Sequence, residues 1–262
     1  MRRIRLHHIV EGPADAPILL LGSSIGTSTR LWAPQVTALA ERFRVVRYDH
    51  RGHGRSPVPR GPYTLNDLGG DVLALLDRLG AARASLAGVS LGGMVSMWVA
   101  AHAPERVDRL ALVCTAARLA PDLWAERAAT VRAAGMAAIA DRVIDRWVPD
   151  DFARHHPDTM AELRAMFLAT PAEGYAGCCD AIRVMDLEPD LGRIGAPTLV
   201  VACLNDEATP PEHAKRIVSS IAGARLALVA GPAHLPNVSH PDVVSRLMLD
   251  FLEEPADVGR AS

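Results

Sequence analysis

The stretch Gly88-Val89-Ser90-Leu91-Gly92 decides how the rest of the chain is interpreted. It matches the pattern G-x-S-x-G, in which a serine stands on a sharp turn between a strand and a helix with its hydroxyl exposed. Such a turn strains the backbone at the serine, so the residues two before and two after it must be nearly free of side chain. An apolar run at 84–87 precedes the pattern, and an apolar helical segment at 94–101 follows it. Ser90 is therefore a candidate nucleophile at the positive end of a helix.

The size and composition of the chain fit one large globular domain, with or without an inserted subdomain: it has 262 residues, of which 49% are hydrophobic and 22% charged. The net charge of −2 offers no basic surface for nucleic acid or an anionic membrane. No apolar run approaches the ~18 residues of a membrane span, and the N-terminal segment lacks the apolar core of a signal peptide. Four cysteines are too few for a disulfide framework. We therefore expect a cytoplasmic protein with no nucleic-acid or membrane partner; the sequence leaves its oligomeric state open.

Strand-like and helical patterns alternate over most of the chain. Short apolar runs predict strands at 4–9, 18–21, 43–48, 84–87, 109–114, 197–203 and 225–229. An apolar repeat of about 3.6 residues predicts helices at 32–42, 66–79, 94–101, 212–221 and 241–252. The second of these helices is expected to begin at about Asn66, a good N-cap residue, and to end at Gly80. The alternation predicts an α/β fold with a mostly parallel central sheet flanked by helices.

The pattern changes between Leu119 and Leu191. Strand-like runs are absent there, and helical patterns rich in Ala and Arg carry two tryptophans and several methionines. We expect an all-helical cap over residues 119–191, inserted into a core domain of residues 1–118 and 192–262. In an open α/β sheet ligands bind at the carboxyl ends of the strands, so such a cap would fold over the binding site.

A serine nucleophile needs a base, and the base needs an acid that orients it. In hydrolases built around this turn, the three residues follow in the chain order serine, acid, histidine. Asp206 lies directly after one predicted core strand, and His234 lies directly after the last. Parallel strands deliver both residues to the edge of the sheet at which Ser90 stands. Asp206 is the predicted acid and His234 the predicted base; Glu207, one residue further from its strand, is the rival acid.

The developing oxyanion needs two backbone N–H donors about 3 Å away. The first is expected from Leu91, immediately after the nucleophile, and the second from Ile25, in the small-residue loop Ser23-Ser24-Ile25-Gly26. His50 and His53 flank a turn without a matching group of carboxylates, so we interpret them as turn residues and predict no metal site. Chemistry of this kind needs no cofactor, and none is predicted.

With these residues in place, the chain resembles the α/β-hydrolase superfamily over nearly its whole length. More narrowly, it resembles the 3-oxoadipate enol-lactonases of the protocatechuate branch of aromatic catabolism. The segments that carry the resemblance are Ser24-Ile25-Gly26-Thr27 with the following Trp32, Asp49-x-Arg51-Gly52-x-Gly54-x-Ser56, Gly88-Val89-Ser90-Leu91-Gly92-Gly93-Met94, Thr170-Pro171-Ala172-Glu173-Gly174-Tyr175-Ala176-Gly177-Cys178-Cys179 and Asp206-Glu207-Ala208-Thr209-Pro210-Pro211. The lactonases commonly have Asn-Ser where this chain has Ser23-Ser24, a departure that leaves the backbone donor intact.

The resemblance implies a serine esterase of the lactonase kind, which opens an enol-lactone to 3-oxoadipate in the β-ketoadipate pathway. The residues support a mechanism in which His234 takes the proton of Ser90 while Ser90 attacks the lactone carbonyl. That lactone carries a carboxylate, so the pocket should hold a cation, and a forked arginine suits best. Arg132, Arg164 and Arg183 of the insertion are the candidates, each with the alternative of a surface ion pair.

Other activities stay open. The first alternative is a carboxylesterase, or a hydrolase of another small ester or lactone, which would use the same three residues. A carbon–carbon bond hydrolase or a cofactor-free haloperoxidase is the next alternative. A dehalogenase or an epoxide hydrolase would need an aspartate at position 90, where this chain has serine. Outside the enzymes, the alternative is a small-molecule receptor on the same fold, since some receptors retain all three residues.

Overall fold

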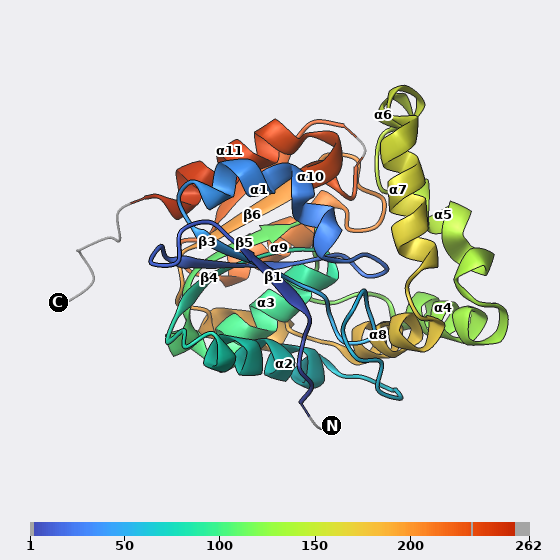
Figure 1. Cartoon of the computed structure of the whole chain (residues 1–262), viewed down its shortest axis with the longest axis horizontal. Coiled ribbons are helices and arrows are strands. Elements are labelled where there is room, and N and C mark those ends of the chain that lie inside the picture. Colours follow the sequence, from blue (N-terminus) through green and yellow to red (C-terminus); the bar gives the residue numbers. More distant parts are fainter. Residues whose placement is uncertain (1–2, 232, 255–262) are drawn as a thin grey trace.

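A seven-stranded sheet forms the centre of the molecule, with the strand order β1-β3-β2-β4-β5-β6-β7 (Figure 1). The computed structural model describes residues 3–231 and 233–254. The strands are β1 His8–Glu11, β2 Ile18–Gly22, β3 Arg44–Tyr48, β4 Ala84–Val89, β5 Val107–Val113, β6 Thr198–Cys203 and β7 Arg225–Val229. β1 pairs antiparallel with β3, and the five other neighbouring pairs within the described residues run parallel. The prediction of a mostly parallel sheet is confirmed.

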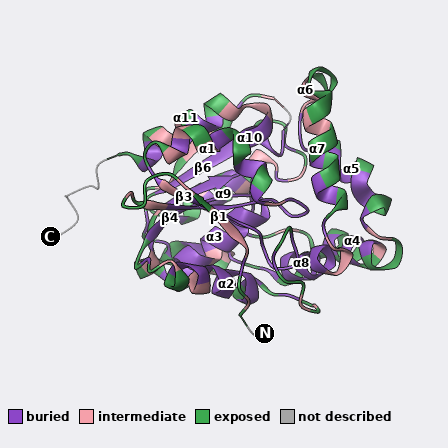
Figure 2. Ribbon diagram, in the orientation of Figure 1, coloured by how far each residue is buried: buried purple, intermediate pink, exposed green. Residues whose placement is uncertain are grey.

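Helices cover both faces of this sheet. They are α1 Ala33–Ala40, α2 Leu65–Arg78, α3 Leu91–His102, α9 Pro211–Ser220, α10 Pro236–Ser239 and α11 Pro241–Leu252. α1 packs with α11 on one face and α2 packs with α3 on the other (Figure 1). Every residue of β4 and β6 is buried, whereas the edge strands β1 and β7 keep partly exposed residues (Figure 2). The apolar runs at 84–87 and 197–203 therefore belong to strands that are covered on both faces.

A second group of helices lies apart from these, at the right of Figure 1. These cap helices are α4 Pro121–Ala134, α5 Ala140–Ile144, α6 Asp150–His155, α7 Pro157–Leu168 and α8 Ala172–Val184. Arg118 pairs with Asp186 in an isolated antiparallel bridge, so the chain leaves the sheet and returns to it at adjacent points. The predicted helical character of the insertion is confirmed, and its exact bounds at 119–191 stay a prediction.

The starts of two elements differ from the prediction. β1 begins at His8 instead of residue 4, because the backbone N–H of Ile4 donates to the Asp71 carboxylate, 2.8 Å away, and not to a neighbouring strand. α3 begins at Leu91, three residues before its predicted start, because the helix follows directly on Ser90. The first turn of α3 therefore belongs to the sharp turn itself.

The start of α2 is set by Thr64 rather than by the predicted Asn66. The Thr64 hydroxyl accepts a hydrogen bond from the N–H of Asp67 at 3.2 Å, and the Asp67 carboxylate accepts one from the N–H of Thr64 at 3.0 Å. This reciprocal pair gives a side-chain acceptor to two N–H groups at the start of the helix. The end of α2 is as predicted, with Gly80 at a positive φ of 67° after the last turn.

Replacing Thr64 with Ala should lower the free energy of unfolding by about 1 kcal/mol, because the N–H of Asp67 loses its side-chain acceptor. Asn66→Ala is the matched control: Asn66 is an exposed residue of the first turn, so its loss should change stability by less than about 0.5 kcal/mol. Urea denaturation followed by circular dichroism measures both. Equal losses in the two variants would contradict the assignment of Thr64 as the N-cap.

Candidate active site

Ser90 stands between β4 and α3 in a backbone conformation that residues with a side chain rarely adopt, with φ 54° and ψ −117°. Glycines make room for this turn. A Cβ on Gly88 would lie 2.2 Å from the backbone carbon of Gly92, and a Cβ on Gly92 would lie 2.2 Å from the carbonyl oxygen of Gly22. The N–H of Ser90 donates to the carbonyl of Val113 at 3.0 Å, which anchors the turn to β5. The strained turn and its two glycines agree with the interpretation of the sequence.

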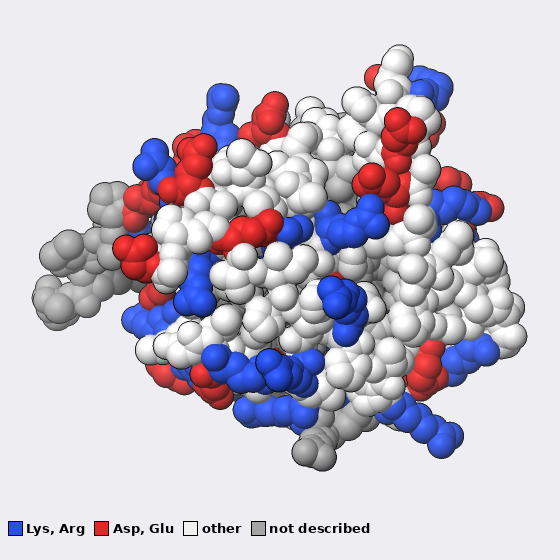
Figure 3. Space-filling view, viewed as in Figure 1, with Lys and Arg blue, Asp and Glu red and all other residues white. Residues whose placement is uncertain are grey.

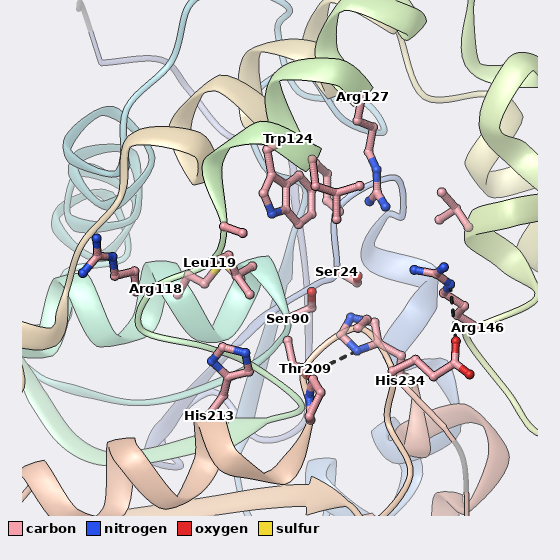
Figure 4. A pocket seen from close by; sticks show the side chains of 18 of the residues that line it. Ser24, Ser90, Arg118, Leu119, Trp124, Arg127, Arg146, Thr209, His213 and His234 are labelled. Carbon is pink, nitrogen blue, oxygen red and sulfur yellow. Dashed lines mark hydrogen bonds and ion pairs between the residues drawn. The ribbon is translucent and has the colours of Figure 1, made fainter.

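Asp206 and His234 are brought into contact by the loops after β6 and β7. Nδ1 of His234 lies 2.9 Å from Oδ2 of Asp206, and both side chains are buried. His234 lines the same cavity as Ser90, and in Figure 4 the hydroxyl of Ser90 and the ring of His234 point into the same space. Because Nδ1 faces the carboxylate, Nε2 is the nitrogen of His234 that is left to accept a proton from Ser90.

The hydrogen bonds around Asp206 favour its charged form. Oδ1 accepts from the N–H groups of Ala208 and Thr209 at 2.8 and 3.2 Å, and Oδ2 accepts from the Thr209 hydroxyl at 2.7 Å. Burial raises the pKa of Asp206, but the interaction with His234 and these hydrogen bonds outweigh it, and the pKa falls to about 2. A charged Asp206 holds the proton of His234 on Nδ1. The sequence interpretation missed Thr209, although its position three residues after the acid was a usable signal.

Glu207, the rival acid, is engaged elsewhere. Its side chain is 75% exposed, and its carboxylate lies 3.6 Å from Nε of Arg146, a residue between α5 and α6. Figure 4 marks this ion pair at the edge of the cavity. The geometry therefore favours Asp206 over Glu207 as the partner of His234.

The two predicted oxyanion donors, Ile25 and Leu91, belong to segments that are tied together. Leu91 is the first residue of α3, a position at which the helix offers its N–H no partner, and Ile25 lines the cavity. Neither N–H donates to an acceptor in the part of the chain that the structure describes. The N–H of Gly92 donates to the carbonyl of Ser23 at 3.0 Å, which fixes the loop after β2 against the start of α3. The role of the two N–H groups stays a prediction.

His50 and His53, interpreted from the sequence as turn residues, have a further role, because they hold the same loop from its other side. Nε2 of His53 accepts the N–H of Gly26 at 2.9 Å, and its Nδ1 lies 3.2 Å from the carbonyl of Arg51. Nε2 of His50 lies 2.9 Å from the carbonyl of Ser23. Burial lowers the pKa of His53 to about 4 and that of His50 to about 3, so both rings are neutral at physiological pH.

The structure gives no support to two other classes of site. Within residues 3–231 and 233–254, no group of three or more His, Cys, Asp or Glu side chains is arranged to hold a metal ion. No helix in the described part of the chain combines the length and the apolar character needed to cross a bilayer. On the face shown in Figure 3, basic side chains gather across the lower middle, and most acidic side chains lie toward the edges of the view.

A cavity of about 550 Å³ lies over Ser90 and His234. The core contributes the loop after β2 and the loop after β6 to its walls, and the cap helices contribute Trp124 and Arg127 of α4 and Val143 of α5 (Figure 4). The insertion thus covers the serine and supplies part of the wall. A volume of this order suits a small organic molecule.

The three arginines predicted for a substrate carboxylate do not line this cavity. Arg132 and Arg183 both pair with Asp180, at 2.6 and 4.0 Å, and Arg164 pairs with a carboxylate of α5. All three therefore follow the alternative of an ion pair. The sequence interpretation missed Arg127, which does line the cavity and is only 8% exposed. Its spacing of three residues after Trp124 places both on one face of α4, but the sequence does not show that this face meets the cavity.

Comparison with known proteins agrees with this geometry. Residues 17–241 match the family described as the alpha/beta hydrolase fold. The chain belongs to this family. The predicted fold class and the predicted relation to hydrolases are thereby confirmed.

Individual relatives narrow the comparison. The chain is 35% identical over 239 residues to 3-oxoadipate enol-lactonase 2 of Acinetobacter baylyi, covering 91% of this chain and 89% of that protein. It is 33% identical to a putative carbamate hydrolase, RutD, of Variovorax paradoxus, covering 94% and 96%. Among solved structures, the enol-lactonase from Burkholderia xenovorans LB400 superposes with a TM-score of 0.93 at 42% identity, covering 95% and 96%. The resemblance to enol-lactonases is confirmed, and the sequence identity to a putative carbamate hydrolase is only slightly lower.

Acid should destabilise the protein through Asp206. Its pKa of about 2 lies below its ordinary value of 3.8, so the charged carboxylate contributes stability above about pH 4 that is lost as the pH falls through about 2. We expect the wild-type free energy of unfolding to fall by about 2 kcal/mol more than that of Asp206→Asn between about pH 5 and about pH 2. Urea titrations at each pH measure this difference. Parallel pH profiles for the two proteins would contradict it.

His53 should act as a positioning residue for the oxyanion loop. His53→Leu removes the acceptor of the Gly26 N–H, so kcat on p-nitrophenyl butyrate should fall by about 10²-fold with a much smaller change in KM. His53→Gln, whose side-chain oxygen can accept the same N–H, should recover part of kcat. Steady-state kinetics and thermal unfolding of both variants provide the measurement. A folded Leu variant with wild-type kcat, or equal losses in both variants, would contradict this role.

Proposed function

We propose that this chain is a serine hydrolase that opens 3-oxoadipate enol-lactone to 3-oxoadipate. The observation that carries the proposal is the buried contact of Asp206 with His234, which lines the same cavity as Ser90. The likeness to two enol-lactonases, one by sequence and one by structure, supports the choice of substrate.

The first half of the proposed reaction makes an acyl-enzyme. Nε2 of His234 takes the proton of the Ser90 hydroxyl, and the serine oxygen attacks the lactone carbonyl. The N–H groups of Ile25 and Leu91 stabilise the oxyanion, and charged Asp206 stabilises the imidazolium. When the ring C–O bond breaks, the electron pair leaves with the enol oxygen. His234 returns its proton to this oxygen, and the resulting enol tautomerises to the 3-oxo group.

The second half frees the acid. His234 takes a proton from water, and the resulting hydroxide attacks the ester carbonyl on Ser90. Collapse of this second tetrahedral intermediate releases the carboxylate and reprotonates Ser90. An enolate is a better leaving group than an alkoxide, so an enol-lactone opens more readily than a saturated lactone with the same catalytic groups. The whole sequence uses side chains and backbone N–H groups of this chain and water.

The second candidate is a hydrolase of another small ester or carbamate. It is favoured by the 33% identity to a protein named as a putative carbamate hydrolase and by a thermophilic esterase that superposes with a TM-score of 0.88 at 28% identity. Both candidates use the same three residues and differ only in the group that leaves the acyl carbon. Substrate comparison, rather than mutation of the triad, separates them.

The test is steady-state hydrolysis of freshly prepared 3-oxoadipate enol-lactone beside p-nitrophenyl acetate and butyrate. Wild type should reach a kcat/KM of about 10⁵ M⁻¹s⁻¹ or more on the lactone and far less on the esters. Ser90→Ala should lower kcat on the order of 10⁶-fold, because the nucleophile is lost.

Ser96→Ala, the same change on the same helix, is the control and should keep wild-type kinetics. Fast turnover of the esters with no opening of the lactone would reject the lactonase and favour the second candidate. A single turnover with the product retained would favour a receptor over an enzyme.

A further inference from the structure

The cavity over Ser90 contains an arginine whose charge is not matched by the protein. Arg127 belongs to α4, is 8% exposed, and in Figure 4 its guanidinium points from the cap into the space that Ser24 and Ser90 border. Within residues 3–231 and 233–254, no carboxylate lies within 4.0 Å of it. Its Nε is buried and has no hydrogen-bond partner in that part of the chain.

The contacts that Arg127 does make are neutral. Its guanidinium carbon lies 4.6 Å from the ring centre of Trp124, and its Nη1 lies 3.4 Å from the hydroxyl of Tyr175. A stacked ring and a phenol hold the planar group in place without cancelling its charge. Arg127 is thus oriented by the protein and left with free donors.

The other arginines on the cavity wall differ in this respect. Arg118 pairs with Asp186 at 3.5 Å, Arg146 with Glu207 at 3.6 Å, and Arg216 with Glu188 at 3.8 Å. Each of these three side chains is also at least 40% exposed, so water screens its charge. Arg127 is the arginine on this wall that combines burial with the absence of a carboxylate partner among the described residues.

A buried guanidinium without a counter-charge is costly, because it has lost its hydration and gained no ion pair. Such a cost is tolerated at a site where a ligand supplies the missing anion. The free donors of an arginine match the two oxygens of a carboxylate in spacing and plane, so a carboxylate is the chemical class that fits.

We propose that Arg127 binds a carboxylate of the substrate and thereby selects anionic lactones over neutral ones. This inference rests on the proposed function and deepens it: the lactone carbonyl lies at Ser90, in the core, while the carboxymethyl arm reaches the cap. The positive charge of Arg127 on the cap then determines which ester binds, and Trp124 and Tyr175 keep the guanidinium in place.

The experiment compares two lactones that share one ring. 3-Oxoadipate enol-lactone carries a carboxymethyl arm, and α-angelica lactone carries a methyl group at the same carbon. Because both contain the same enol-lactone ring, loss of its absorbance follows the ring opening of either substrate. Arg127→Met, which keeps an unbranched apolar stem and removes the charged guanidinium, should lower kcat/KM for the anionic lactone on the order of 10²-fold and leave the neutral lactone nearly unchanged. Arg127→Lys should fall between wild type and Met, because it keeps the charge without the fork.

Arg118→Met is the matched control, since Arg118 lines the same cavity in a paired and exposed state; it should not change the ratio of the two lactones. Thermal unfolding checks that each variant is folded. Equal losses on both lactones in Arg127→Met would assign Arg127 to the packing of the cap and overturn the proposal. Unchanged turnover of the anionic lactone would overturn it as well.

Binding of adipate, measured by calorimetry, tests Arg127 without any turnover. Adipate should bind wild type and Ser90→Ala and should bind Arg127→Met at least about tenfold more weakly. If wild type opened neither lactone, the proposed function would fail, and adipate binding that depends on Arg127 would still support the carboxylate site. Equal adipate affinity in wild type and Arg127→Met would reject the site whatever the lactone kinetics show.

Discussion

The contact on which the site depends is the approach of two backbones, at Gly92 in the first turn of α3 and at Gly22 at the end of β2. A Cβ on Gly92 would lie 2.2 Å from the carbonyl oxygen of Gly22, so any side chain there would drive the helix away from the sheet. The close approach lets the N–H of Gly92 reach the carbonyl of Ser23 at 3.0 Å. One backbone contact therefore sets the strained turn at Ser90 and the position of the loop that carries Ile25.

That loop is held from its other side by the turn after β3. His53 accepts the N–H of Gly26, and Asp49 accepts the N–H of Thr29 at 2.7 Å through one carboxylate oxygen and that of Arg55 at 2.9 Å through the other. The motif that the sequence predicts as a turn is thus also a set of acceptors for a neighbouring loop. His53 can hold this loop only in its neutral form, because only an unprotonated Nε2 can accept the hydrogen bond of Gly26.

The core could be predicted from the sequence, and most of the cap site could not. In a parallel sheet, the residues that directly follow the strands all lie at the same edge. Ser90, Asp206 and His234 each directly follow a strand, so the sequence alone was enough to predict that they lie together. The cap helices have no such framework. Whether an arginine there faces the cavity or an acid is decided by packing between α4 and α8, so Arg132 and Arg127, five residues apart on one helix, could not be told apart. Burial, which makes Arg127 unusual, is a property of the fold alone.

Three aromatic rings connect the parts of the site across the boundary between core and cap. Trp147 packs edge-on against Phe167, with ring centres 5.6 Å apart, and Phe167 packs edge-on against Tyr175 at 5.5 Å. The carbonyl of Trp147 accepts from the N–H of His234 at 3.2 Å, and the hydroxyl of Tyr175 lies 3.4 Å from Arg127. Phe167 also packs closely against the loop that carries Ile25: a Cβ on Gly26 would lie only 2.7 Å from its ring. His234, the loop that carries Ile25 and Arg127 therefore all contact one cluster of packed aromatic rings, so the proposed base, the proposed oxyanion loop and the proposed carboxylate-binding group share one set of neighbours.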